Sequence, residues 1–417
     1  MESRYDDRRS KIKIRDDMKM NTKQDFPIFK NIDSLIYFDN ASTTQKPQCV
    51  IDSITNYYTQ YNANVHRGAY NIAEKATSEF EKSRKIIADF VNANTEEIVF
   101  TKGTTESINL IAYTFGSTLK DGDEIIISEM EHHSNIIPWQ MLMEQKNIKL
   151  KYIPVCSNGQ LDVKQLKRLV NNKTKLISII HMSNILGSIN PINKISKIAK
   201  KNNIPLLVDA AQSIAHHKID VQKIDCDFLT FSGHKLMGPT GVGILYINNK
   251  FINKLNPFLR GGHMIKEVKY DSSTWNDAPW KFEAGTANIA QVIGLASSIK
   301  YIENIGIENI HKHTQNLKKH LLTQLNNINE INIYGHQNND FGPIISFNIK
   351  GCHPYDIAKL LDRYNICIRA GHHCGQILMK KLKTNYTNRI SLYYYNSKNE
   401  IDFFISRLNK IIKILKK

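Results

Sequence analysis

The sequence lacks any long apolar segment. Among its 417 residues, no uninterrupted apolar run approaches the roughly 18 residues that a membrane-crossing helix needs. The first 20 residues also lack the apolar stretch of a secretory signal peptide. We therefore expect neither membrane insertion nor secretion, and we predict a cytoplasmic location. The acidic residues in this opening segment argue against an organelle-targeting sequence and predict a basic and acidic tail, with Met1, Met18 and Met20 as candidate starts.

Cysteines are few and scattered. The six of them, at positions 49, 156, 226, 352, 367 and 374, show no C-x-x-C spacing. This pattern suggests neither a disulfide framework nor a zinc ribbon, and a reducing compartment is the simplest environment for it.

Acidic residues are outnumbered by basic ones. The chain has 56 Lys and Arg against 39 Asp and Glu, a formal net charge of +17. Such a charge is typical of proteins that bind nucleic acids, but here the basic residues are spread along the whole chain and form no single block. We predict no nucleic-acid and no membrane partner. A basic nucleic-acid-binding protein with a degenerate enzyme fold remains an alternative, and its binding would be salt-sensitive.

Internal repeats and linkers rich in Pro, Gly or Ser are also absent, and strand and helix patterns alternate instead. Apolar, β-branched runs predict strands over residues 96–101, 124–128, 149–155, 175–182, 204–210, 226–232 and 242–247. Helical spacing separates several of them, over 79–91, 162–172 and 193–203. Buried parallel strands with crossover helices produce this pattern. The prediction is an α/β fold with a large domain over residues 31–300.

The last part of the chain changes in pattern. A long helix over 307–327 precedes predicted strands over 331–335 and 344–349, a helix over 354–364, strands over 366–371 and 389–395, and a final helix. This order favours a smaller α+β domain over residues 301–417. Residues 1–30 are predicted to form a tail and an arm that associates with it.

Two charged residues follow two of the predicted strands. Asp209 ends the strand at 204–210, and Lys235 follows the strand at 226–232 within SGHKLMGP. Groups at the carboxyl ends of strands in an open α/β sheet meet in one crevice. Pyridoxal phosphate chemistry needs this pair, a lysine that holds the cofactor as a Schiff base and an aspartate that keeps its pyridine nitrogen protonated. Alone, the aspartate would be read as a helix cap and the lysine as a surface residue.

Other polar residues are predicted near the same edge of the sheet. Thr104 and Thr105 begin a helix after the strand at 96–101, and free N–H groups at a helix start favour a phosphate. The same residues are also an ordinary helix N-terminus. His132 and His133 follow the strand at 124–128, where an imidazole ring could stack on a cofactor or simply face solvent.

The segment RAGHHCGQ, residues 369–376, places two histidines directly before Cys374. It allows three interpretations: a metal site, a loop with an inert buried cysteine, and an activated nucleophile. Adjacent side chains point in different directions and no second ligand pair lies nearby, so zinc is disfavoured.

A series of longer motifs carries a family resemblance. DNASTTQKP, NVHRGAY, GTTESINL, MEHHSNIIPWQ, HMSNILGSINP, VDAAQSIAHHKIDV, DFLTFSGHKLMGPTGVGILY, KFEAGTAN and RAGHHC occur in this order over roughly residues 25–410. Together they resemble the SUF-type, or group II, cysteine desulfurases of the aminotransferase class V family. The resemblance implies the fold type I of pyridoxal-phosphate-dependent transferases, with a mainly parallel sheet in the large domain.

The resemblance also implies roles for individual residues. Lys235 would hold the cofactor and then act as a base, His132 would stack on the cofactor ring, and Asp209 would bind the pyridine nitrogen. The remaining cofactor contacts would be Gln212 and Asn184 near the phenolic oxygen, and Thr105, Ser232, His234 and Thr286 of the partner subunit on the phosphate. The substrate would meet Arg389, whose guanidinium suits a carboxylate, and Asn184, with His66, Arg67 and Arg369 at the entrance.

The implied reaction converts L-cysteine to L-alanine and leaves a persulfide on Cys374. A homodimer would pass this sulfur to a SufE- or SufU-like acceptor and a SUF scaffold complex for iron–sulfur cluster assembly, because the short loop around Cys374 goes with acceptor dependence in the family. Since the thiolate is the nucleophile, His372, His373 and Arg369 are candidates for activating it. Selenocysteine lyase, as an activity of the same site, and an aminotransferase that needs no Cys374 remain alternatives within this fold.

Two departures from the family pattern are visible. Ala287 stands where the family usually has proline, beside Thr286. Gly375, Gln376 and Ile377 replace the residues that usually follow the nucleophile, which leads us to expect greater flexibility next to Cys374.

Overall fold

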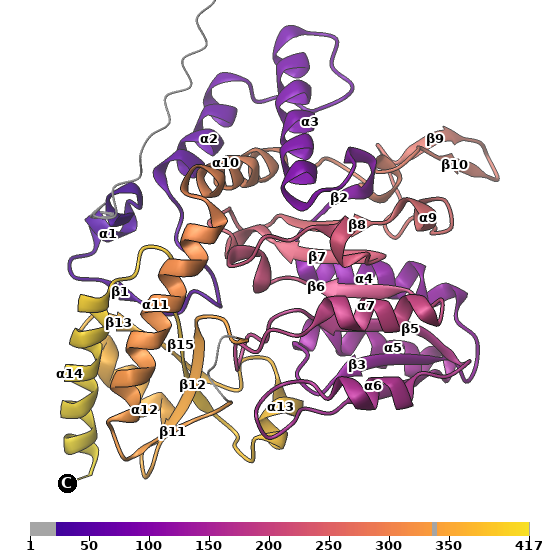
Figure 1. Cartoon of the computed structure of the whole chain (residues 1–417). Coiled ribbons are helices and arrows are strands. Elements are labelled where there is room, and N and C mark those ends of the chain that lie inside the picture. Colours follow the sequence, from indigo (N-terminus) through magenta and orange to yellow (C-terminus); the bar gives the residue numbers. More distant parts are fainter. Residues whose placement is uncertain (1–21, 336–339, 417) are drawn as a thin grey trace, which may run out of the picture.

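A computed structural model describes residues 22–335 and 340–416 of the chain (Figure 1). The predicted basic and acidic tail, with its candidate start residues, lies outside the described residues.

A seven-stranded sheet organises the first part of the molecule. Its order is β2-β8-β7-β6-β5-β3-β4, and β8 alone among these strands is antiparallel to its neighbours. The strands are β2 (Ile98–Thr101), β3 (Glu124–Ser128), β4 (Lys149–Ile153), β5 (Thr174–Ile180), β6 (Leu206–Asp209), β7 (Phe228–Ser232) and β8 (Gly243–Ile247). All seven coincide with predicted strands, and the α/β prediction with a mainly parallel sheet is confirmed.

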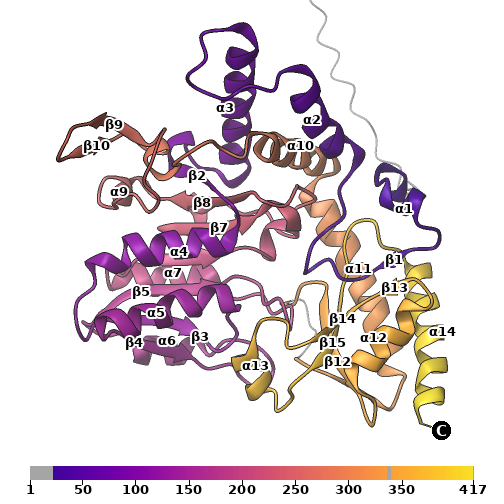
Figure 2. The ribbon, with the colours of Figure 1, turned by 180° about the vertical axis from the view of Figure 1, so that it is seen from behind.

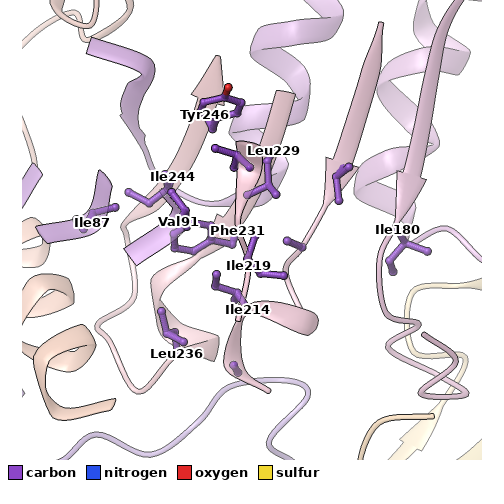
Figure 3. Packing of buried hydrophobic residues seen from close by; sticks show 14 of the residues in the cluster. Ile87, Val91, Ile180, Ile214, Ile219, Leu229, Phe231, Leu236, Ile244 and Tyr246 are labelled. Atoms are coloured by element: carbon purple, nitrogen blue, oxygen red, sulfur yellow. The ribbon is translucent and has the colours of Figure 1, made fainter. Parts of the chain in front are cut away.

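Both faces of this sheet are buried, which explains why its strands are continuous apolar runs. In β3, Ile126 belongs to one hydrophobic cluster and Ile125 and Ile127 to the cluster on the opposite face. Figure 3 shows the first cluster, with Leu229 and Phe231 of β7 beside Ile244 of the adjacent β8. The edge strand β4 is more exposed than the rest.

Helices cover the two faces separately. Residues of α4 (Thr104–Thr114) and α5 (Ile137–Lys146) pack in the second cluster, on the face seen in Figure 2. The first cluster takes residues from α3 (Asn71–Val91), α6 (Val163–Leu169), α7 (Ile192–Lys201), α8 (Val221–Ile224) and α10 (Ile289–Ile305). Helix α2 (Gln48–Gln60) packs on α10, and α9 (Asn249–Ile252) precedes a hairpin of β9 (Ile265–Val268) and β10 (Ser273–Trp275) that projects from the body (Figure 1).

The last part of the chain forms a four-stranded antiparallel sheet with the order β11-β12-β15-β14. Its strands are β11 (Ile331–Ile333), β12 (Ile344–Ile349), β15 (Thr387–Ser391) and β14 (Arg369–Gly371), and the adjoining helices are α11 (Ile307–Asn326), α12 (Pro354–Asp362), α13 (Gln376–Lys381) and α14 (Lys398–Leu415). Helices α11, α12 and α14 share a hydrophobic cluster with this sheet.

Two features connect the parts of the chain that hold the two sheets, and the predicted domain boundaries stay a prediction. Helix α10 continues through residue 300. Strand β1 (Ile36–Tyr37), placed in the large domain by prediction, pairs in parallel with β13 (Ile366–Cys367) near the second sheet. Before it, a 3₁₀ turn (Thr22–Asp25) and α1 (Ile28–Asn31) form the arm, where Lys23 pairs with Glu400 of α14 and Phe26 packs on Tyr395.

None of the helices described over residues 22–335 and 340–416 combines the length and apolar character that crossing a membrane requires.

Candidate active site

The carboxyl ends of β6 and β7 place the two predicted charges together. Asp209 is the last residue of β6, and Lys235 ends the 3₁₀ turn Gly233–Lys235 that directly follows β7. Both line a cavity of about 210 Å³. Most of the other predicted site residues line the same cavity: Thr105, His132, Asn184, Gln212, Ser232, His234, Arg369, Cys374 and Arg389.

Burial controls the charge state of Lys235 and Asp209. Burial lowers the pKa of Lys235 to about 8, although Asp209 opposes this shift. Burial raises the pKa of Asp209, while the N–H of Ala211, which donates to Oδ1 at 2.9 Å, and the charge of Lys235 lower it. No hydrogen bond or ion pair between described residues reaches the Lys235 Nζ, so this amine is available to a ligand in the cavity.

His132 is held as a neutral ring. Its Nδ1 accepts the Ser134 N–H at 3.1 Å, which places the ring proton on Nε2. Burial, and then the positive charge of Lys235, lower the pKa of His132 to about 3. The Ser134 hydroxyl bonds the His132 Nδ1 and the Thr105 hydroxyl, so the ring and the start of α4 are fixed to each other.

The start of α4 forms a polar cradle. Ser232 Oγ accepts the Thr104 N–H at 2.9 Å and bonds the Thr104 hydroxyl. A side chain on Gly243 would collide with the backbone of Gly103, so glycine at 243 allows β8 to pass directly against the turn before α4. This close approach brings hydroxyl groups and the positive end of a helix to the cavity, which favours a phosphate.

Two arginines bring positive charge to the cavity. Arg389, which is 1% exposed, donates to Asp39 Oδ1 at 2.7 Å, to Ser42 Oγ at 2.9 Å and to the Asn184 carbonyl at 2.9 Å. Arg369 donates to the same Ser42 hydroxyl at 2.6 Å. The Arg389 Nε and the Asn184 Oδ1 are buried without a hydrogen-bond partner among the described residues, so both can still bind a ligand.

The loop that carries Cys374 is short and is held in place by hydrogen bonds. Only residues 372–375 join β14 to α13. The His133 N–H donates to the Cys374 carbonyl at 2.9 Å, and the His133 Nε2 accepts the Gln376 N–H at 3.2 Å. His373 and Cys374 both have left-handed backbones, with φ of 52° and 56°, a conformation that costs about 1 to 3 kcal/mol each for residues other than glycine. These contacts constrain the segment that we expected to be more flexible.

The two histidines beside Cys374 have different environments. Burial lowers the pKa of His373 to about 2, and its Nε2 bonds the Thr387 hydroxyl at 2.9 Å. His373 is therefore neutral and directed toward β15. The His372 Nδ1 accepts the Cys374 N–H at 3.2 Å, and its ring lies 5.8 Å from the His133 ring. Among the three candidates for activating the thiol, Arg369 is the permanent cation that lines the cavity with it.

Replacing Gly375 by alanine is expected to lower the free energy of unfolding by about 1 to 3 kcal/mol, as overpacking commonly does. The new Cβ would collide with Ile185 Cδ1, and the displaced loop would slow chemistry at Cys374. Denaturant unfolding and the rate at which a thiol reagent alkylates Cys374 measure the two effects. Gly261→Ala, which adds a methyl group in open space, is the control. Equal stability of both variants would contradict the packing argument.

Three predicted site residues lie outside the cavity. Thr286 is exposed on the segment between the 3₁₀ turn Trp280–Phe282 and α10. The His66 Nε2 lies 3.3 Å from Glu81 Oε1, the His66 ring stacks on His263, and its neighbour Arg67 is exposed. None of the three lines the cavity that holds Lys235.

Sequence reasoning missed several partners of the site. Ser134 orients His132, while Asp39 and Ser42 orient the arginines. The only available signal was position: Asp39 and Ser42 follow the strand in LIYFDNAS, and Ser134 lies two residues after His132.

The donors of the cavity fit pyridoxal phosphate. A buried lysine without a partner, an adjacent aspartate, a neutral imidazole and a hydroxyl-lined helix start correspond to its aldehyde, pyridine nitrogen, ring and phosphate. The fold and this set of groups define the class of pyridoxal-phosphate-dependent fold type I enzymes.

The chain belongs to the aminotransferase class-V family, whose model matches residues 36–404. It is 46% identical over 402 residues to a protein named cysteine desulfurase from Wigglesworthia glossinidia brevipalpis, covering 95% of this chain and 98% of the relative. It is 44% identical to a probable cysteine desulfurase from Halalkalibacterium halodurans, covering 93% of this chain and 96% of the relative.

A solved structure agrees. The apo structure of a cysteine desulfurase from Thermococcus onnurineus NA1 superposes with a TM-score of 0.92 at 41% identity, covering 95% of this chain and 98% of that chain. The predicted resemblance to the cysteine desulfurases and the predicted fold are confirmed.

Proposed function

We propose that this protein is a SUF-type cysteine desulfurase that converts L-cysteine to L-alanine and retains the sulfur as a persulfide on Cys374. One observation carries the proposal: the Cys374 thiol lines the same cavity as Lys235, Asp209 and two arginines. An aminotransferase has no use for a thiol at that place.

Each residue of the cavity has a distinct role in the proposed reaction. When bound, pyridoxal phosphate supplies an electron sink for the Cα proton removal. Arg389 and Arg369 bind the carboxylate of L-cysteine, because a guanidinium suits a carboxylate. Lys235, with a pKa lowered to about 8 by burial, is available in its neutral form as the base for the Cα proton. Asp209 binds the pyridine nitrogen, and the neutral His132 stacks on the ring.

The transfer of sulfur to Cys374 needs no added oxidant. The Cys374 thiolate attacks the sulfur of the substrate, an S–S bond forms, and the C–S bond breaks. The electron pair of that bond stays with carbon, which gains a proton and leaves as alanine. Gln212 and Asn184 lie on the cavity wall and are assigned to the phenolic oxygen of the cofactor. Thr105, Ser232 and His234 are assigned to its phosphate.

A homodimer and a sulfur acceptor complete the proposal. Thr286 is exposed and does not line the cavity of its own chain. The exposed apolar residues Leu259, Val268 and Tyr270 lie in the same part of the sequence, so Thr286 is assigned to the site of a second subunit. The short loop at residues 372–375 favours delivery to a SufE- or SufU-like acceptor for iron–sulfur cluster assembly. The cytoplasmic location stays a prediction.

Mass spectrometry tests the proposal directly. After incubation with L-cysteine, the peptide with Cys374 is expected to gain one sulfur atom that a thiol reductant removes, with one alanine released per sulfur. The Cys367 peptide of the same digest is the internal control. A keto acid as product, with no sulfur on Cys374, would refute the assignment.

A further inference from the structure

We propose that Arg84 is a positioning residue that holds the Thr286 segment and His66 as one rigid unit for the cofactor site of the second subunit. This inference rests on the proposed function. We call Arg84, Glu81, Glu283, His66 and His263 the Arg84 cluster.

Arg84 on α3 is 1% exposed and uses its whole guanidinium. Its Nη1 and Nη2 donate to the two oxygens of Glu283 at 2.7 and 2.9 Å. Nε donates to Glu81 at 2.8 Å, and Nη1 also donates to the Ile98 carbonyl of β2 at 2.9 Å. The guanidinium lies 4.2 Å from the centre of the Phe100 ring. This bidentate, stacked geometry is one that lysine cannot reproduce.

Glu283 passes this constraint to the segment that carries Thr286. Its Oε1 accepts two hydrogen bonds, one from Arg84 Nη1 and one from the Phe100 N–H of β2 at 2.8 Å. Two residues later, the Gly285 N–H donates to the Gly262 carbonyl at 3.0 Å. Thr286 follows immediately, so its backbone is fixed at the exposed end of a buried ion pair.

His66 is attached to the other side of the cluster. Its Nε2 lies 3.3 Å from Glu81, and its ring stacks on His263 with centroids 5.0 Å apart. Burial alone would raise the pKa of Glu81, but His66 and Arg84 outweigh it and lower the pKa to about 2. His66 has a left-handed backbone with φ of 70°, which marks a constrained position. Two of the three predicted site residues outside the cavity, Thr286 and His66, are therefore joined through Arg84.

Stability alone is a weak reason for such a buried cluster. Charges lose hydration on burial, and apolar residues of similar volume often serve stability equally well. What a bidentate ion pair adds is a fixed geometry. The segment that it fixes does not line the cavity of its own chain, and the proposed second subunit is where that geometry has a use.

Glu283→Gln is expected to weaken cofactor binding about tenfold or more, because a displaced contact of about 1 Å is costly at an active site. Arg84→Lys, which keeps the charge and loses the fork, is the second variant. Glu97→Gln is the matched control, since Glu97 is a buried glutamate that accepts backbone N–H groups of Asn94 and Asn249. Among the described residues, it shares no hydrogen bond or ion pair with the Arg84 cluster. The readout is the affinity of the apoprotein for pyridoxal phosphate, followed by visible absorbance.

Mixed dimers separate positioning from a general structural defect. In a dimer of one Glu283→Gln subunit and one Lys235→Ala subunit, the single lysine-bearing site meets the intact segment of the other subunit. Its lysine-bound absorbance band is expected to titrate with wild-type affinity. Affinity that stays weak in this mixed dimer would overturn the inference, as would unchanged affinity in the Glu283→Gln and Arg84→Lys homodimers. Failure of the proposed function is distinct, since wild-type protein would then release no alanine.

Discussion

Cys374→Ala is expected to abolish alanine formation from L-cysteine and to leave the visible absorbance of the bound cofactor unchanged. In the proposed reaction the thiol is the acceptor of the sulfur, and no other cysteine lines the cavity described around Lys235. Its removal also leaves the contacts of His133 with the loop intact, because these use the Cys374 carbonyl and the Gln376 N–H. Amino-acid analysis of the product and an absorption spectrum measure the two effects.

Cys367→Ala is the matched control for this result. Cys367 lies seven residues upstream, is partly buried in β13 and remains outside the cavity, so its removal is expected to preserve turnover. Full turnover of the Cys374→Ala variant to a keto acid would establish an aminotransferase instead. With L-selenocysteine, turnover retained by the variant would identify a selenocysteine lyase activity at the same site.

Lys235→Ala is expected to lower turnover by at least about 10²- to 10⁴-fold, the usual contribution of a positioned acid or base. It is also expected to remove the absorbance of a lysine-bound cofactor. Lys235 is the lysine whose pKa burial lowers to about 8 next to Asp209. Under the proposed function, removal of its amine takes away the covalent anchor and the base together. Steady-state alanine formation and a spectrum after reconstitution with pyridoxal phosphate are the measurements.

Lys318→Ala tests whether the loss of any buried lysine has the same effect. Lys318 on α11 is 4% exposed, donates to the Phe341 carbonyl at 2.6 Å, and burial lowers its pKa to about 8 as well. It lies outside the cavity, so the variant is expected to lose stability and keep the cofactor. A Lys235→Ala protein that retains wild-type turnover would exclude the proposed mechanism.

Local pattern was sufficient to predict the strands and the sites at their ends. Each strand of the large sheet is a short apolar run between polar turns, and a run buried on both faces has a distinct composition. Asp209 and Lys235 could be brought together from sequence because the carboxyl ends of neighbouring strands share one edge.

Contacts between distant segments could not be predicted in this way. The antiparallel pairing of β8 with β2 and β7, and the close passage of Gly243 against Gly103, join positions far apart in the sequence. Neither short segment contains a signal for them. The pairing of β1 with β13 and the grip of Arg84 on Glu283 also depend on the complete fold. For the same reason the sequence does not predict that the His373 ring points toward β15, where its Nε2 bonds the Thr387 hydroxyl.

One short turn, which contains His132 and His133, contacts both the Lys235 cavity and the Cys374 loop. His132 faces the cofactor cavity, and the next residue, His133, grips the loop of Cys374 through its backbone N–H and its ring. Under the proposed function, the cofactor-facing wall and the Cys374 loop thus depend on one short piece of backbone. We expect substitutions in this turn to disturb both together.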